Sequence, residues 1–354
     1  MLEYLKQLSK EYKMPLENVL SIALNRYGII CKETEDNRLR FEVKILNNEN
    51  PTFFAVCVNT YEKTPFLLKD EKLYLEGSEI GSVSNIEKDT CTSTYFRNNK
   101  KAITFNSNSR SKCSGCKFCG TYSLSEDDFV DFSTSDKIKN YFEILLKQNQ
   151  IQGMNNIEDV TLCTGCFENE DALIDHLLKI NTAFIEMGFK GRINYIGSQL
   201  RDYNKIYALN KEIPDFGLYL TVEKFLDREK YMRKEKSDLT LKDAHELLNY
   251  TSSIGITSTF LYILGLEDLE TVKKYMEYFK DSVNKFPIVQ VFQNYTANQE
   301  FYRCEEAKDV KYYLEARKII NDIFTESNLS PRAWECFRGL CFEEKGKKQL
   351  RLEK

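Results

Sequence analysis

From Ala102 onwards, short apolar segments alternate with longer segments whose apolar residues recur at helical spacing. The segments with strand character are 102–105, 157–162, 192–196, 216–222, 257–264 and 289–292. Those with helical character are 138–146, 171–187, 203–209, 241–252 and 269–279. Strands that alternate with helices indicate βαβ units and therefore a parallel sheet. We expect an α/β protein whose β/α repeats form either a barrel or an open doubly wound sheet.

Three cysteines lie in the loop that follows the first of these strands. Cys113, Cys116 and Cys119 fall within seven residues. Cysteines this close are poor disulfide partners for one another, whereas three neighbouring thiolates suit a metal ion or an iron–sulfur cluster. A [4Fe–4S] cluster held by three cysteines keeps its fourth iron open for a substrate or cofactor. The loop is therefore the expected place of the chemistry.

This arrangement resembles the radical S-adenosylmethionine superfamily, in which three cysteines follow the first strand of a partial (β/α)6 TIM-like barrel and an aromatic residue precedes the third. Phe118 holds the aromatic position. The resemblance implies that the open iron binds S-adenosylmethionine, and that one electron from the cluster cleaves it to methionine and a 5′-deoxyadenosyl radical, which takes a hydrogen atom from the substrate. The motif departs from the usual spacing, because Cys113 and Cys116 are separated by one residue fewer.

Active sites of such barrels lie at the carboxyl ends of the strands. The resemblance places Thr164 and Gly165, after the second strand, at the amino group of S-adenosylmethionine, and Ser198, after the third strand, at its carboxylate. A plain strand-to-helix turn at 163–166 and a helix N-cap at Ser198 are the alternative interpretations.

The fourth and fifth strands supply the other expected cofactor contacts. Glu223 ends the fourth strand, and a carboxylate there can accept both ribose hydroxyl protons. Arg233, in the basic segment that follows, is expected to grip the methionyl carboxylate with its guanidinium fork, although such segments are often solvated helix faces. Phe118, Ile263 and Gly265 are expected to lie beside the adenine. No catalytic residue is assigned.

The β/α region, residues 99–303, is flanked by two smaller parts. Residues 1–98 show helical spacing at 2–8 and 16–26, followed by alternation of period two at 39–45 and further strands at 53–56 and 73–75, which predicts a small N-terminal α+β domain. This domain is expected to present substrate or to act as a stabilising lid. Residues 304–354 are expected to form a helical C-terminal extension. Cys304, Cys336 and Cys341 in this extension are either ligands of a second cluster or packed cysteines.

The amino-acid composition disfavours some classes of binding partner. The 354 residues are 42% hydrophobic and 29% charged, as in ordinary globular proteins. A net charge of −4 gives no general attraction for nucleic acid or anionic membranes. Charged residues soon interrupt the N-terminal segment, and the chain has no apolar run of membrane-spanning length. We expect a cytoplasmic protein, and with only two histidines a catalytic zinc site is hard to assemble.

The resemblance predicts a biosynthetic radical S-adenosylmethionine enzyme that acts on a small molecule or peptide and takes electrons from a donor such as flavodoxin or ferredoxin. The sequence does not specify the reaction. Two alternatives stay open. One is a zinc-binding interaction protein that uses Cys113, Cys116, Cys163 and Cys166 as a four-thiolate site. The other is an iron–sulfur electron-transfer protein that does not bind S-adenosylmethionine.

Overall fold

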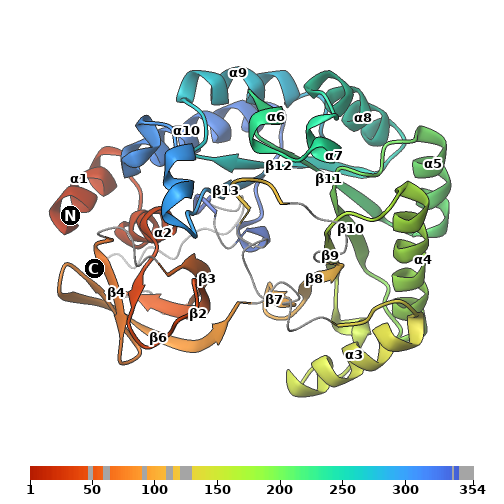
Figure 1. The fold of residues 1–354 in the computed structure, drawn as a ribbon, viewed down its shortest axis with the longest axis horizontal. Coiled ribbons are helices and arrows are strands. Elements are labelled where there is room, and N and C mark those ends of the chain that lie inside the picture. The colour runs from red at the N-terminus through yellow and green to blue at the C-terminus, as the bar shows by residue number, and fades with distance from the viewer. Residues whose placement is uncertain are drawn as a thin grey trace.

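The computed structural model of the chain describes residues 1–46, 51–58, 64–89, 94–108, 115–119, 130–336 and 339–342. Within these residues lie two β-sheets with helices packed around them (Figure 1). The first sheet has six strands in the order β1-β4-β5-β6-β2-β3, and the second has seven in the order β13-β12-β11-β10-β9-β8-β7. The predicted mixed α/β class is confirmed.

The first sheet is built from residues 30–88 and follows two helices, α1 (Leu2–Glu11) and α2 (Leu16–Tyr27). Its strands are β1 (Ile30–Cys31), β2 (Arg38–Ile45), β3 (Thr52–Cys57), β4 (Phe66–Lys69), β5 (Lys72–Leu75) and β6 (Ser78–Lys88). Apart from the parallel pair β1 and β4, the neighbouring strands are antiparallel. The period-two pattern of β2 buries Leu39, Phe41, Val43 and Ile45, as predicted.

The second sheet contains a series of parallel strands in chain order. They are β8 (Ala102–Asn108), β9 (Asp159–Thr164), β10 (Arg192–Gly197), β11 (Phe216–Glu223), β12 (Thr257–Leu264) and β13 (Ile288–Val291). A short strand, β7 (Tyr95–Arg97), pairs antiparallel with β8 at one edge. Residues 95–97 thus join the second sheet, although they precede the boundary predicted at residue 98.

Helices connect the parallel strands and lie along the outside of the curved sheet (Figure 1). The longer ones are α3 (Ser135–Gln148), α4 (Glu170–Glu186), α5 (Tyr203–Glu212), α8 (Leu241–Ser253) and α9 (Leu269–Phe279), and α10 (Val310–Glu326) follows the last strand. Two short helices, α6 (Arg228–Tyr231) and α7 (Lys234–Ser237), precede α8 in the connection after β11. Several of them begin at a polar N-cap, such as Thr134, Asn169 and Asp268, whose side chain accepts a backbone N–H of the first turn. None of the helices among the described residues is long and apolar enough to span a membrane.

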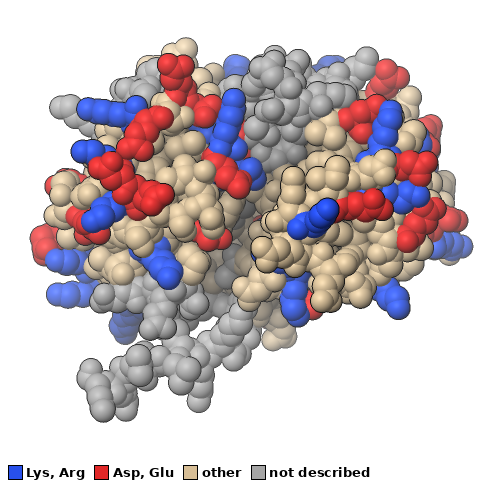
Figure 2. Space-filling model, turned by 90° about the horizontal axis from the view of Figure 1, so that it is seen from below, with Lys and Arg blue, Asp and Glu red and all other residues tan. Residues whose placement is uncertain are grey.

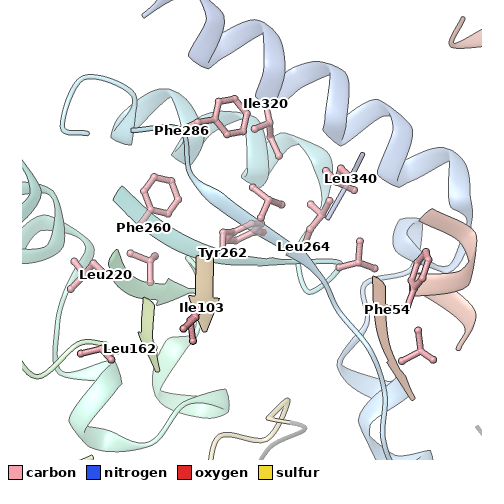
Figure 3. Packing of buried hydrophobic residues seen from close by; sticks show 14 of the residues in the cluster. Phe54, Ile103, Leu162, Leu220, Phe260, Tyr262, Leu264, Phe286, Ile320 and Leu340 are labelled. Atoms are coloured by element: carbon pink, nitrogen blue, oxygen red, sulfur yellow. The ribbon is translucent and has the colours of Figure 1, made fainter. Parts of the chain in front are cut away.

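Apolar side chains from adjacent strands pack against the outer helices (Figure 3). Ile103, Leu162, Leu220 and Phe260 lie on β8, β9, β11 and β12, and all eight residues of β11 are buried. Strands covered on both faces in this way are typical of parallel sheets in α/β proteins. On the face drawn in Figure 2, acidic and basic side chains are intermixed.

A segment near the end of the described chain links the two edges of the second sheet. At the β7 edge, Arg97 donates to the carbonyl of Glu335 at 2.7 Å. At the β13 edge, the Cys336 thiol donates to the carbonyl of Val289 at 3.5 Å, and the Lys285 ammonium lies 2.5 Å from a Glu335 carboxylate oxygen. Residues 334–336 therefore join the two edges near the amino ends of the parallel strands.

Candidate functional site

The cysteine loop, residues Gly115–Cys119 in the described part, belongs to the connection that follows β8. Cys113 lies outside the described residues. Gly115 has φ of 82°, in the left-handed region that favours glycine. The Cys119 N–H donates to the Cys116 carbonyl at 2.9 Å, so the two cysteines lie at the ends of one turn. Cys116 is buried and Cys119 is half-buried, and both carry free thiols.

Both cysteines lie beside a small apolar cluster. Its buried members are Cys116, Phe118, Met232, Leu266 and Phe292, and Cys119, Ile263, Tyr231 and Tyr302 pack against it. Phe118 and Ile263 are the two bulky side chains that the sequence analysis placed beside an adenine. The fold therefore brings them together with two of the three predicted cluster ligands, at the carboxyl ends of the strands.

The peptide groups between the two cysteines are held from two sides. The Lys117 N–H donates to the Tyr231 carbonyl at 2.9 Å, and the Lys117 carbonyl accepts from Gln299 Nε2 at 3.0 Å. Tyr231 belongs to the connection after β11, and Gln299 belongs to a 3-10 segment after β13, Ala297–Tyr302. Contacts from the segment after β11 and from the segment after β13 therefore hold the loop.

Glu223, predicted at the ribose, ends β11 in a left-handed conformation with φ of 61°. Both of its carboxylate oxygens accept from the Lys236 ammonium, at 2.8 and 2.9 Å. Burial lowers the pKa of Lys236, but the charge and hydrogen bonds of Glu223, together with the neighbouring thiols of Cys116 and Cys119, outweigh this effect and leave that pKa raised. Burial raises the pKa of the Cys116 thiol to about 11, although the nearby Lys236 charge acts in the opposite direction. The pair therefore places a partly buried cation close to Cys116.

Arg233, predicted at the methionyl carboxylate, lies at the start of α7 with a side chain only 2% exposed. Within the part of the chain that the structure describes, none of its three guanidinium nitrogens makes a hydrogen bond. The Glu235 carboxylate, which is mostly exposed, lies 3.8 Å from Arg233 Nε. Arg233 lines a pocket of about 530 Å³ together with Gly115 and Lys117 of the cysteine loop and the rings of Tyr231 and Tyr302. A buried guanidinium with unmade hydrogen bonds, next to a pocket, favours an anionic ligand.

The remaining predicted residues lie at the same edge of the sheet. Thr164 ends β9 and Gly165 follows it, and both are half-buried. Ser198 follows β10 and is buried, and its hydroxyl has no hydrogen-bond partner among the residues described. The alternative role of Ser198 as a helix N-cap is wrong, because Asp202 caps α5. The strand ends therefore point these residues toward the side of the sheet from which the cysteine loop departs.

Gly265, expected beside the adenine, follows β12 with φ of 115°. A Cβ atom at this position would lie 2.8 Å from the Tyr313 hydroxyl, and the Gly265 carbonyl accepts from the Cys304 N–H at 3.0 Å. Position 265 therefore favours glycine for two reasons: the backbone has a positive φ, and a side chain would collide with Tyr313.

Sequence reasoning missed the residues that support this edge. The carboxylate of Glu267 accepts from the Leu226 N–H at 2.6 Å and from the Tyr262 hydroxyl at 2.9 Å, and it lies 3.2 Å from the Lys224 ammonium. It thereby holds the connection that leads to Arg233 and Lys236. Leu226 and Lys224 are more than 40 residues from Glu267 in the sequence, so neither periodicity nor a motif could have identified these contacts; the only signal was an acid soon after a strand end.

The other cysteine groupings are not supported. Within the described ranges, no three histidine, cysteine, aspartate or glutamate side chains are placed to hold a metal ion. Cys116, Cys163 and Cys166 therefore do not form the core of a four-thiolate zinc site.

The same holds for a second cluster on Cys304, Cys336 and Cys341. The Cys304 thiol donates to the Glu267 carbonyl at 3.1 Å, and the Cys336 thiol donates to the Val289 carbonyl. The Cys341 side chain packs against the main hydrophobic core. The thiols of Cys304 and Cys336 are each bonded to a backbone carbonyl and Cys341 is packed, which favours the alternative interpretation given above.

Comparison with known proteins gives little direct guidance. No protein-family model matches the sequence, and no curated protein gives a significant match. Among solved structures, the chain is similar to a radical S-adenosylmethionine methyltransferase, TsrM from Kitasatospora setae, determined with cobalamin and a [4Fe–4S] cluster. The identity is 15%, the TM-score is 0.33, and the match covers 54% of this chain and 36% of that one. Because this chain spans only about a third of that protein and the similarity is low, the functional argument rests on the site itself.

Proposed function

We propose that this protein is a radical S-adenosylmethionine enzyme, with a [4Fe–4S] cluster held by Cys113, Cys116 and Cys119 on a partial (β/α)6 barrel formed by β8 to β13. The observation that carries the proposal is the apolar cluster at the carboxyl ends of the strands, in which Cys116, Cys119, Phe118 and Ile263 meet. The cysteine loop after the first parallel strand, β8, thus contacts the end of the fifth, β12. In the family that the sequence resembles, these two parts of the chain bind the cluster and the adenine.

The surroundings of the cysteine loop suit a cluster with thiolate ligands. Cys116 is largely excluded from water, and its raised pKa means that it meets a metal as a thiol and releases a proton when it binds. The partly buried Lys236 ammonium offsets part of the negative charge that three thiolates bring. When bound, the cluster supplies the electron that cleaves S-adenosylmethionine to methionine and a 5′-deoxyadenosyl radical.

The residues around the loop are proposed to bind S-adenosylmethionine. Arg233 would pair with the methionyl carboxylate, because its guanidinium is buried, lines the pocket and has hydrogen bonds to give. Ser198 would donate to the same carboxylate, and Thr164 with Gly165 would meet the amino group.

The adenosine moiety would lie on the other side of the site. Glu223 would accept from the ribose hydroxyls while it stays paired with Lys236, since each carboxylate oxygen has a second lone pair. Phe118, Ile263 and Gly265 would line the adenine. The substrate is proposed to be a small molecule or peptide, and an electron donor such as flavodoxin or ferredoxin would reduce the cluster.

The test is anaerobic reconstitution followed by reduction with dithionite, with electron paramagnetic resonance recorded before and after S-adenosylmethionine is added. We expect a [4Fe–4S]+ signal that changes on addition, with release of 5′-deoxyadenosine. Replacing Cys116 or Cys119 with alanine is expected to remove both. Cys31→Ala, in the first sheet, is the matched control and is expected to retain both.

Two results would contradict the proposal. A colourless protein with bound zinc would indicate an interaction protein. An iron–sulfur signal that S-adenosylmethionine leaves unchanged, without 5′-deoxyadenosine, would indicate an electron-transfer protein.

A further inference from the structure

We propose that Gln299 is a positioning residue for the cysteine loop, and that the N-terminal helix α2 braces it. The inference rests on the proposed function in one respect: it assumes that the cysteine loop holds the cluster. The Gln299 side chain is 8% exposed, and both ends of its amide are used. Its Nε2 donates to the Lys117 carbonyl at 3.0 Å, and its Oε1 accepts from the Tyr295 N–H at 2.7 Å.

The contact acts on the part of the loop between the two described cysteines. Lys117 directly follows Cys116, and its carbonyl is the acceptor for Gln299. The Lys117 N–H is held from the opposite direction by the Tyr231 carbonyl. Because the peptide groups on both sides of the Lys117 Cα are fixed, Cys116 and Cys119 keep one orientation relative to each other. A cluster needs its thiolates preoriented, so this contact bears on cluster binding.

Segment 297–302, which carries Gln299, is itself fixed to the rest of the molecule. The neighbouring Glu300 carboxylate accepts from Arg26 Nη2 at 2.8 Å and from Arg303 Nε at 2.9 Å. Arg26 lies in the last turn of α2, and its Nε also donates to the Ala307 carbonyl at 3.1 Å. The Tyr302 ring packs edge-on against Tyr231, with centroids 5.5 Å apart.

A continuous set of contacts therefore runs from the N-terminal region to the cysteine loop: Arg26 to Glu300, Glu300 to its chain neighbour Gln299, and Gln299 to Lys117. This assigns a task to α2 that differs from presenting substrate. Helix α2 contacts segment 297–302, and this segment in turn contacts the cysteine loop.

The experiment measures thiol reactivity in the apo-protein, so that it does not require a loaded cluster. Iodoacetamide alkylation of individual cysteines is followed by mass spectrometry in the wild type, Gln299→Ala and Gln299→Glu. Alanine removes both hydrogen bonds, whereas glutamate keeps an acceptor for the Tyr295 N–H but offers no donor to Lys117. We expect alkylation of Cys116 and Cys119 to become about fivefold faster in both variants, the factor that corresponds to one hydrogen bond.

Two controls separate positioning from general loosening. Asn284 also bridges two backbone groups, with Oδ1 accepting from the Ser258 N–H at 2.7 Å and Nδ2 donating to the Ile256 carbonyl at 2.8 Å, but at the opposite end of the sheet. Asn284→Ala is expected to leave the Cys116 and Cys119 rates unchanged. Cys31, buried in the first sheet, reports global unfolding within each variant and is expected to react at its wild-type rate.

Reconstituted protein provides a second readout. Iron loss to a chelator is expected to be about fivefold faster in Gln299→Ala and to increase in Arg26→Gln as well. Wild-type alkylation rates at Cys116 and Cys119 in both Gln299 variants would overturn the proposal, and so would an equal increase at Cys31. If the wild type binds no cluster, the proposed function fails, while the alkylation result still decides whether Gln299 positions the loop.

Discussion

Replacing Glu335 with glutamine should destabilise the protein strongly. Glu335 and Lys285 form an ion pair at 2.5 Å with both side chains only 9% exposed. Burial lowers the pKa of Lys285, even though the carboxylate of Glu335 acts to raise it. The glutamine variant keeps the shape of the side chain but leaves the ammonium without its main counter-charge. Removing one partner of a buried ion pair costs about 3–5 kcal/mol, a large part of the ~5–15 kcal/mol that stabilises a typical domain.

The stability loss in Glu335→Gln is expected to depend on pH in a definite direction. Lys285 can escape the penalty by losing its proton, and it does so more easily as the pH rises. The loss of stability in Glu335→Gln is therefore expected to be largest near neutral pH and to shrink on the alkaline side. The free energy of unfolding, measured by urea denaturation at several pH values, provides the assay.

A double variant separates charge from packing. Lys285→Met with Glu335→Leu removes both charges and is expected to lie within about 2 kcal/mol of the wild type, because an apolar pair of similar volume often replaces a buried ion pair at little cost. A Glu335→Gln protein within about 0.5 kcal/mol of the wild type would show that the pair is solvated in solution and would refute the reasoning.

Three further predictions concern other parts of the structure. Burial lowers the pKa of His176 to about 4, so its neutral form supports the fold above pH 6.5, and the free energy of unfolding should fall by up to about 3 kcal/mol as the pH drops from 6.5 towards 4; His176→Phe should flatten this slope in urea titrations. Arg233→Gln should weaken binding of S-adenosylmethionine at least about tenfold in equilibrium dialysis without lowering the unfolding free energy, since the guanidinium makes no hydrogen bond to any of the described residues; unchanged binding would remove Arg233 from the site. Gly265→Ala, at φ of 115° and against the Tyr313 hydroxyl, should cost about 1–3 kcal/mol in thermal unfolding, and a neutral result would mean that the backbone relaxes there.

The regular elements of the second sheet could be predicted from the sequence because their apolar periods are long and clear. The segments 257–264 and 269–279 match β12 and α9 in both bounds. In contrast, β6 was missed, because most of its side chains are exposed and it has no apolar alternation to detect. The short helices α6 and α7 were read only as a charged connection, since four residues carry no helical period.

The candidate site shows the same division. Cys116, Phe118 and Ile263 were predicted as site residues because a motif and a strand end mark them, and the fold brings them into one cluster. The partners that hold the site were not identified. Lys236 pairs with Glu223 across 13 residues, and Gln299 reaches Lys117 across 182, so only the folded chain brings them together.

Residues 334–336, which join β7 to β13, follow every strand of the second sheet in the chain. During synthesis from the amino end, all the strands therefore leave the ribosome before the segment that connects their two edges. Until then Lys285 lacks its counter-charge, and the amino-terminal end of the curved sheet lacks the contacts that join its edges. The contacts of this segment with the two edges can therefore form only after every strand of the second sheet has been synthesised.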